Sequence, residues 1–209
     1  MKRLSTLTLC GSLLLAGGAP GVAADSASVT ATSPANAIDA VKAESASLLE
    51  QITKSLTGLA SQAGTTAGAT PAAGDSFVSQ LQSLATSIQS GDDAGASGTL
   101  QKLMAAKPTD GQLAVLDDVR NNFALLALGR NFDTASSATQ SAVGSAITAI
   151  KTGNATDIVT SLQGLYSNAR LTDTQKELVT GLVGSWNPKL ADVATKAGKL
   201  RDTAKLFGF

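Results

Sequence analysis

The sequence contains no histidine, and its one cysteine, Cys10, lies in an apolar run near the N-terminus. The lack of histidine excludes Ser-His-Asp and Cys-His catalysis and every metal site with an imidazole ligand. If that apolar run is a cleaved leader, thiol catalysis and thiolate-bound zinc or iron–sulfur clusters are excluded too. P-loop and dinucleotide-binding fingerprints are also missing. We therefore predict a protein without catalytic residues, cofactor or bound metal.

Aromatic residues make up 3% of the chain and charged residues 15%. A sequence so rich in alanine, glycine, serine and threonine suits slim, closely packed helices better than a large aromatic-lined pocket. Removal of Lys2 and Arg3 with a leader leaves 14 basic against 16 acidic residues, a net charge of −2. This balance gives no sign of a nucleic-acid partner.

Residues 1–24 are predicted to form a secretory signal peptide of bacterial type. A basic start precedes a mostly apolar run, Leu4 to Leu15, which is too short to span a bilayer. Val22-Ala23-Ala24 matches the small-residue pattern of a cleavage site, so the mature chain is expected to begin at Asp25. We therefore expect export to the periplasm or the cell exterior.

An N-terminal amphipathic helix is predicted over residues 36–62, after a disordered tail over 25–35. Its apolar residues follow a heptad-like stripe, in which Ser45 and Ser55 occupy two positions. The stripe consists of Ile38, Val41, Leu48, Ile52 and Leu59. Small residues and a proline make residues 63–74 a predicted flexible linker.

The remaining residues, 75–209, contain an internal repeat. Residues 88–123 align with 150–186 after one inserted residue, and such self-similarity marks a duplicated helical unit. We predict copies over about 75–133 and 134–187, followed by a C-terminal helix over 188–208. The aligned pairs include Ile88 and Ile150, Gly91 and Gly153, Leu100 and Leu162, Leu103 and Leu165, Leu116 and Val179, Val119 and Leu182, and Phe123 and Trp186.

Capping residues place the helix starts within the copies. Asp75 is expected to cap the first helix. Thr109 with Gln112, and Thr172 with Gln175, each match a capping box. Because the apolar spacing is helical throughout and no alternating strand pattern occurs, we predict an all-α fold. The expected architecture is a helical array or bundle built from a duplicated three-helix unit with flanking helices.

The segment AIKTGNATDIVTSLQGL, residues 149–165, resembles the junction between the two helices of tetratricopeptide-type repeats. The resemblance rests on Ala149-Ile150, Gly153 and Leu162. It implies a solenoid-like array that presents a protein-binding surface. The copies here are about 62 residues and three helices apart, whereas that family repeats two helices in about 34 residues. The family's peptide-binding residues are therefore not carried over.

Carboxylates are the remaining candidates for chemistry. Asp92-Asp93 and Asp117-Asp118 could hold a cation or an acid/base pair, but adjacent helical residues point in different directions. We expect helix capping and solvation for these pairs instead. An enzyme that acts on glycans with carboxylates alone would have to use one of the glutamates. These are Glu44, Glu50 and Glu177.

Tyr166 and Trp186 are the only tyrosine and tryptophan of the chain. Both fall on apolar stripes, and Trp186 aligns with Phe123 of the first copy. We predict that both pack in the core, with stacking on a sugar or a peptide as the alternative.

The last predicted helix, opened by Pro188, has the one surface with a strong charge bias. Its basic residues outnumber its two acidic residues, Asp192 and Asp202, and its apolar residues follow three-four spacing. The basic residues are Lys189, Lys196, Lys199, Arg201 and Lys205. We favour a helix that closes the array, and the alternative is a basic amphipathic helix that contacts anionic lipid or an acidic partner.

These predictions favour a non-enzymatic, exported scaffold or protein-interaction module of the bacterial cell envelope. Its partner is expected to be another envelope protein, and no nucleic acid. The alternatives are a membrane-surface binder that acts through amphipathic helices and an enzyme that acts on glycans with carboxylates alone.

Overall fold

The computed structural model describes residues 34–65 and 71–187, which form seven helices and no strand. Contacts divide the chain into Met1–Ala31 and Thr32–Phe209, and all seven helices belong to the second unit. Over the described residues, the prediction of an all-α fold is therefore confirmed. The helices are α1 (Pro34–Thr65), α2 (Pro71–Ser90), α3 (Asp93–Ala105), α4 (Asp110–Asn131), α5 (Ser137–Thr152), α6 (Ala155–Asn168) and α7 (Asp173–Trp186).

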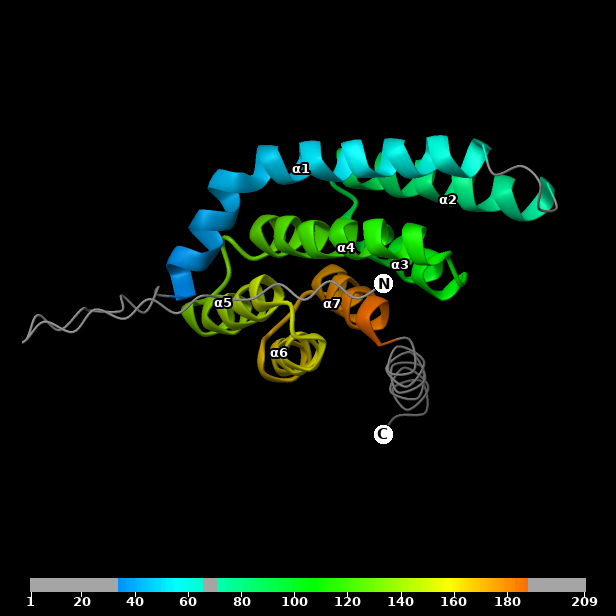
Figure 1. The fold of residues 1–209 in the computed structure, drawn as a ribbon. Helices are drawn as coiled ribbons and strands as arrows, with labels where there is room; N and C mark the ends of the chain where they lie inside the picture. Colours follow the sequence, from blue (N-terminus) through cyan, green and yellow to red (C-terminus); the bar gives the residue numbers. More distant parts are fainter. Residues whose placement is uncertain (1–33, 66–70, 188–209) are drawn as a thin grey trace, which may run out of the picture. The chain divides into compact units, whose positions relative to one another are not determined.

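The apolar stripe of α1 forms the seam that holds this helix to its neighbours. α1 packs along α4 and also contacts α5 and α2. It bends after its first turns, so that its start reaches α5 while its later turns run beside α2 and α4 (Figure 1). Residues three and four apart share one helix face, which is why heptad-like spacing predicts such a seam. Its buried residues, all at most 6% exposed, are Ile38, Val41, Leu48, Ile52, Leu56 and Leu59.

Both helices that flank the predicted linker extend into it. Of the predicted linker, 63–74, only residues 66–70 lie outside the described helices. Pro71 begins α2, so the prediction that Asp75 caps this helix is wrong. Proline suits the first turn because its φ is already helical and its missing amide would have no partner there. Pro34 begins α1 in the same way.

Helix boundaries in the two copies have the same local structure. Gly91 and Gly153 end α2 and α5 with φ of +77° and +75°, the left-handed region that favours glycine. Both predicted capping boxes are formed at the starts of α4 and α7. In each box, the threonine hydroxyl accepts a hydrogen bond from the backbone N–H of the glutamine. The side-chain oxygen of the glutamine accepts one from the backbone N–H of the threonine.

The copies nevertheless pack across each other. α3 of the first copy packs closely against α7 of the second, while its contact with α4 is small. In the α3–α7 contact, a Cβ added to Gly181 would meet the Ser97 side chain, with the Ser97 Cβ only 2.7 Å away. A repeated three-helix arrangement like that of tetratricopeptide arrays is therefore not confirmed.

Several predicted segments lie outside the described residues. These are the signal peptide over 1–24, most of the tail over 25–35, and the C-terminal helix over 188–208 with Pro188. Among the helices that are described, none combines the length and the hydropathy that crossing a bilayer requires.

Candidate functional site

The basic residues predicted to contact a partner or a membrane all lie beyond the last described residue, Asn187. They are Lys189, Lys196, Lys199, Arg201 and Lys205. Their role stays a prediction, and the candidate site has to be built from the described helices.

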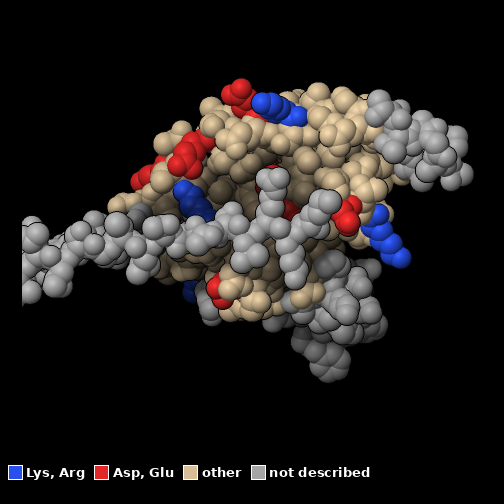
Figure 2. All heavy atoms as spheres, viewed as in Figure 1, with Lys and Arg blue, Asp and Glu red and all other residues tan. Residues whose placement is uncertain are grey.

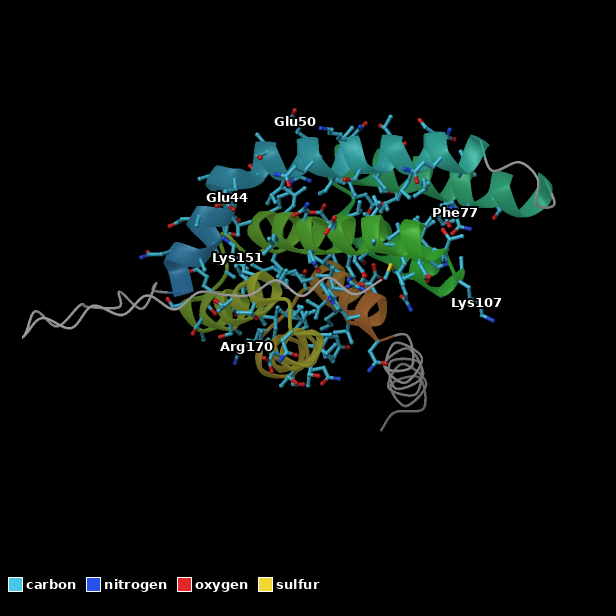
Figure 3. The ribbon with its side chains drawn as sticks, viewed as in Figure 1. Glu44, Glu50, Phe77, Lys107, Lys151 and Arg170 are labelled. Atoms are coloured by element: carbon cyan, nitrogen blue, oxygen red, sulfur yellow. The ribbon has the colours of Figure 1, made fainter. Side chains whose placement is uncertain are left out.

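The three glutamates do not converge. Glu44 and Glu50 are exposed on α1, where Glu50 points away from the other helices (Figure 3). Glu177 is exposed on α7. The Glu44 Oε2 atom lies 3.7 Å from Lys151 Nζ, an ion pair between α1 and α5. Glycan hydrolysis uses two carboxyl groups facing one bond. The described structure does not place two glutamates in that way.

The paired aspartates have different surroundings. Asp92 caps α3 as predicted, because its carboxylate accepts a hydrogen bond from the Gly95 amide at 3.0 Å. Asp117 pairs with Arg120 Nη2 at 2.8 Å on the same helix, while Asp118 is exposed. For Asp93 the prediction of capping and solvation is wrong, because only 4% of this residue is exposed.

Asp93 lies at the centre of a polar junction where α3, α4 and α7 meet. Asn131 Nδ2 donates a hydrogen bond to Asp93 Oδ2 at 2.7 Å, and Arg130 Nη1 lies 3.5 Å from Asp93 Oδ1. Gln175 Nε2 donates to the Asn131 carbonyl oxygen at 2.7 Å, which ties the start of α7 to the end of α4. We call Asp93, Arg130, Asn131 and Gln175 the polar junction.

The charge of Asp93 is only partly compensated in this junction. Burial raises the pKa of the Asp93 carboxyl, because the ionised form loses its hydration. The hydrogen bond from Asn131, and the charge and close guanidinium contact of Arg130, act in the opposite direction, while the nearby charge of Asp92 adds to the increase. Asp93 Oδ1 is buried without a hydrogen bond, since the contact with Arg130 is an ion pair without hydrogen-bond geometry.

A second polar contact holds the other end of α7. Arg120 Nη1 on α4 donates to the Ser185 carbonyl oxygen at 3.2 Å. The Arg120 guanidinium also lies 4.7 Å from the centroid of a Trp186 ring, a cation–π contact. Burial lowers the pKa of Arg120 and the charge of Asp117 opposes this shift. The guanidinium stays charged at neutral pH because its ordinary pKa is so high.

The two aromatic residues differ in burial. Trp186 is partly buried and packs against the core, as predicted. Tyr166 is 38% exposed, so the prediction of core packing is wrong for this residue. Its neighbour on α6, Leu165, is fully buried. Adjacent helical residues point about 100° apart, and here Leu165 rather than Tyr166 faces inward.

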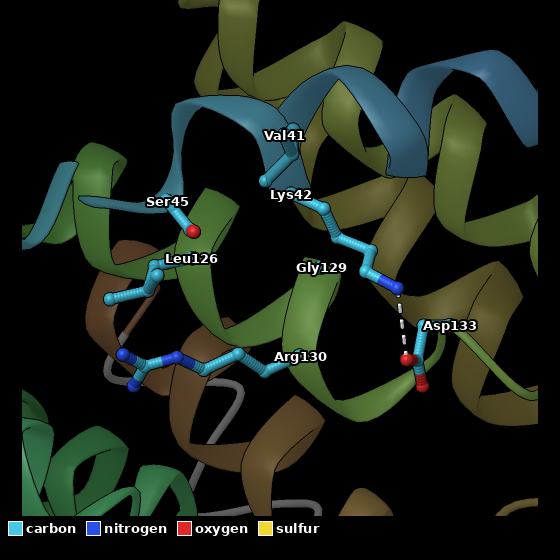
Figure 4. A pocket seen from close by; sticks show the side chains of 7 residues that line it. All are labelled: Val41, Lys42, Ser45, Leu126, Gly129, Arg130 and Asp133. Atoms are coloured by element: carbon cyan, nitrogen blue, oxygen red, sulfur yellow. Dashed lines mark hydrogen bonds and ion pairs between the residues drawn. The ribbon is translucent and has the colours of Figure 1, made fainter. Parts of the chain in front are cut away.

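A cavity lies where Ser45 interrupts the seam of α1. It has a volume of about 260 Å³ and is lined by residues of α1 and of the end of α4 (Figure 4). Lys42 Nζ and Asp133 Oδ2 form an ion pair at 3.2 Å on one side of it. The two helices approach closely here, since a Cβ on Gly129 would lie 2.9 Å from Val41 Cγ1. Ser55, the second serine on the stripe, lines another hollow of about 640 Å³ between α1 and α4.

The largest of these hollows is an open groove of about 810 Å³ between α1 and α5, which reaches the first turn of α6. We call it the α1–α5 groove. Its two charged residues are Lys151, which pairs with Glu44, and Asp157, with which no described residue forms an ion pair. Its lining is otherwise small, aliphatic or hydroxyl-bearing: Ala37, Ala40, Gly144, Ser145, Ile147, Thr148, Ala149 and Thr152.

Figure 2 shows how charge is distributed on one face of the molecule. On the face shown in Figure 2, acidic and basic side chains are interspersed among uncharged residues rather than gathered into a patch of one sign. Within residues 34–65 and 71–187, no three His, Cys, Asp or Glu side chains are grouped so that they could hold a metal ion. Comparisons with protein-family models, curated proteins and solved structures give no match for this chain.

Sequence reasoning missed the polar junction. In the repeat alignment Asp93 falls on Ala155, and Arg130 and Asn131 follow the aligned segment, so the duplication gave no signal. One signal was available in the pair Asp92-Asp93. Only one of the two can cap the helix. The side chain of the other points in a different direction, so its carboxylate has to be solvated or paired with another group.

Proposed function

We propose that the protein is a non-enzymatic, exported scaffold of the bacterial cell envelope that binds a segment of a partner protein in the α1–α5 groove. The observation that carries this proposal is the groove itself, formed by helices from distant parts of the sequence. Preformed concave surfaces are the usual places where proteins bind ligands and peptide segments. The signal-peptide pattern of residues 1–24 supports the location in the envelope.

The lining of the groove indicates the chemistry of its partner. Ala37 and Ala40 offer an apolar surface without bulky side chains, so a partner backbone can approach closely. The hydroxyl groups of Ser145, Thr148 and Thr152 donate to backbone carbonyls of α5, so their oxygens remain as hydrogen-bond acceptors in the groove. Asp157 offers a negative charge that attracts a cation. The matching partner segment carries small apolar side chains next to a lysine or an arginine.

The test blocks the groove without disturbing the fold. Ala40→Trp places a large ring in the groove, whereas Ala46→Trp places the same ring on the exposed face of α1, away from the hollows described above. Mature wild type and both variants are used to capture partners from an envelope extract of the source organism. We expect the wild type and Ala46→Trp to capture the same protein and Ala40→Trp to lose it, at equal melting temperatures.

Photo-crosslinking localises the contact. A photoreactive residue at position 40 should form an adduct with that protein, and one at position 46 should not. Equal capture by both tryptophan variants, or adducts from position 46 alone, would contradict binding in the groove.

The membrane-surface alternative gives a different result. Salt-sensitive co-sedimentation of the intact protein with anionic vesicles, kept by Ala40→Trp and lost on deletion of residues 189–209, would favour a lipid contact through the basic C-terminal residues.

A further inference from the structure

We propose that Asp93 is a proton-uptake site built into the polar junction, which makes the folded protein more stable at acidic pH than it would be with an ordinary, solvated aspartate at this position. This inference concerns the α3–α4–α7 contact and is independent of the α1–α5 groove. It rests on three observations: the burial of Asp93, the weak compensation of its charge, and the position of the junction at the start of α7.

The negative charge of Asp93 is weakly compensated, because both of its partners also bind backbone carbonyl oxygens. Asn131 Nδ2 donates to Asp93 Oδ2 at 2.7 Å, but it also lies 2.9 Å from the Ala127 carbonyl oxygen. Arg130 is one-third exposed, at 34%, and its Nη1 also donates to the Ile88 carbonyl oxygen at 3.2 Å. A buried carboxylate with one oxygen lacking a hydrogen bond is costly, and proton uptake removes that cost.

The charged groups nearest to Asp93 lie on α3 and α4. α2 also packs against α3, but its end contributes only the Ile88 carbonyl oxygen, which binds Arg130. On α4, Arg130 is the single cation that faces it, and Asp133, just past the helix end, is paired with Lys42. On α3 itself, Asp92 adds a second negative charge. The start of α7 contributes the uncharged Gln175 to the junction. Its nearby charges, Asp173 and Lys176, are exposed and pair with each other at 3.1 Å.

Protonation leaves the junction connected. Asp93 Oδ2 can still accept the hydrogen bond from Asn131, while the proton resides on Oδ1. Arg130 keeps its hydrogen bond to the Ile88 carbonyl oxygen and its access to solvent. The link from Gln175 to the Asn131 carbonyl oxygen does not involve the carboxylate. Neutral Asp93 therefore removes a buried charge without removing a contact of α7.

The sign of the pH dependence follows from the direction of the shift. The pKa of Asp93 is raised above its ordinary value of 3.8 in the folded protein, so the folded state binds this proton at a higher pH than the unfolded state. Stability contributed by this group therefore rises as the pH falls through the folded-state pKa. It levels off below the unfolded-state pKa, where both states are protonated.

The experiment compares wild type with Asp93→Asn by urea denaturation at a series of pH values from about 7 to about 3, which extends below the ordinary pKa of an aspartate. Trp186 fluorescence and far-UV circular dichroism follow unfolding. Asp118→Asn is the matched control, because it removes one exposed carboxylate of α4 that forms no ion pair with a described residue and leaves the surroundings of Asp93 unchanged. On acidification, the midpoint of the wild type should rise relative to that of Asp93→Asn. A constant or falling difference, or the same trend against Asp118→Asn, would overturn the proposal.

A second measurement does not depend on the folding of a variant. The carboxyl carbon of Asp93 can be titrated by NMR in the folded wild-type protein. We expect its midpoint to lie above that of an ordinary aspartate. A midpoint at or below the ordinary value would show that Arg130 and Asn131 outweigh burial, and would equally overturn the proposal.

Discussion

Gly181 lies at a close approach of two helices, where a side chain has no room. A Cβ at this position would lie 2.7 Å from the Ser97 Cβ and 3.1 Å from the Ser97 carbonyl carbon of α3. The overpacking in Gly181→Ala should cost towards the upper end of the usual range of about 1–3 kcal/mol. After the gain of about 1 kcal/mol that alanine brings to a helix, we predict a free energy of unfolding that is lower by about 1–2 kcal/mol. Urea denaturation measures the difference.

Gly98→Ala is the matched control on α3, because a Cβ there meets nothing within 4 Å. It should leave stability unchanged or raise it by up to about 1 kcal/mol. Ser97→Gly should restore part of the stability that Gly181→Ala loses. If Gly181→Ala were as stable as the wild type, α3 and α7 would not pack as described.

At the scale of a helix, the two capping boxes should contribute equally. Thr109→Ala and Thr172→Ala each remove the oxygen that accepts a hydrogen bond from the third helical amide. We expect each to lower the free energy of unfolding by about 0.5–2 kcal/mol. Thr57→Ala is the control, because the Thr57 hydroxyl donates to a carbonyl of its own helix at an exposed position. Losses no larger than that of the control would show that the caps do not stabilise these helices.

Filling the cavity beside Ser45 should strengthen the packing of α1 against α4. Ser45 is partly buried beside the cavity of about 260 Å³, which has room for two more carbon atoms. We predict that Ser45→Val raises the free energy of unfolding by about 0.5–2 kcal/mol, as cavity filling commonly does. Ala46→Val, on the exposed face of the same helix, should bring no such gain. A lower melting temperature for Ser45→Val than for Ala46→Val would contradict the account of the seam.

Elements whose structure is set by nearby residues could be predicted from the sequence. The seam of α1, the capping boxes and the glycines that end α2 and α5 depend on spacing within one or two helical turns. Burial of Asp93 and the pairing of α3 with α7 depend on residues far apart in the chain. No sequence pattern indicates that Gly181 contacts Ser97. Arg130 likewise becomes a partner of Asp93 only when α3 packs against α4.

At the scale of the whole unit, α7 links the first copy to the second. Gln175 binds the end of α4, Gly181 packs on α3, and the last turn is held by Arg120 of α4. A helix held at its start, middle and end by the other copy cannot unfold without exposing the core of both. The described helices should therefore unfold in one cooperative transition.

Urea denaturation followed by two probes tests this central claim most directly. Trp186 is the only tryptophan, so its fluorescence reports the end of α7, while far-UV circular dichroism reports all helices. We predict coincident transitions for the two probes in the wild type, and an equal shift of both in Gly181→Ala. Fluorescence that changes at a lower urea concentration than the helical signal would show that the second copy unfolds by itself, which would contradict the interlocked packing.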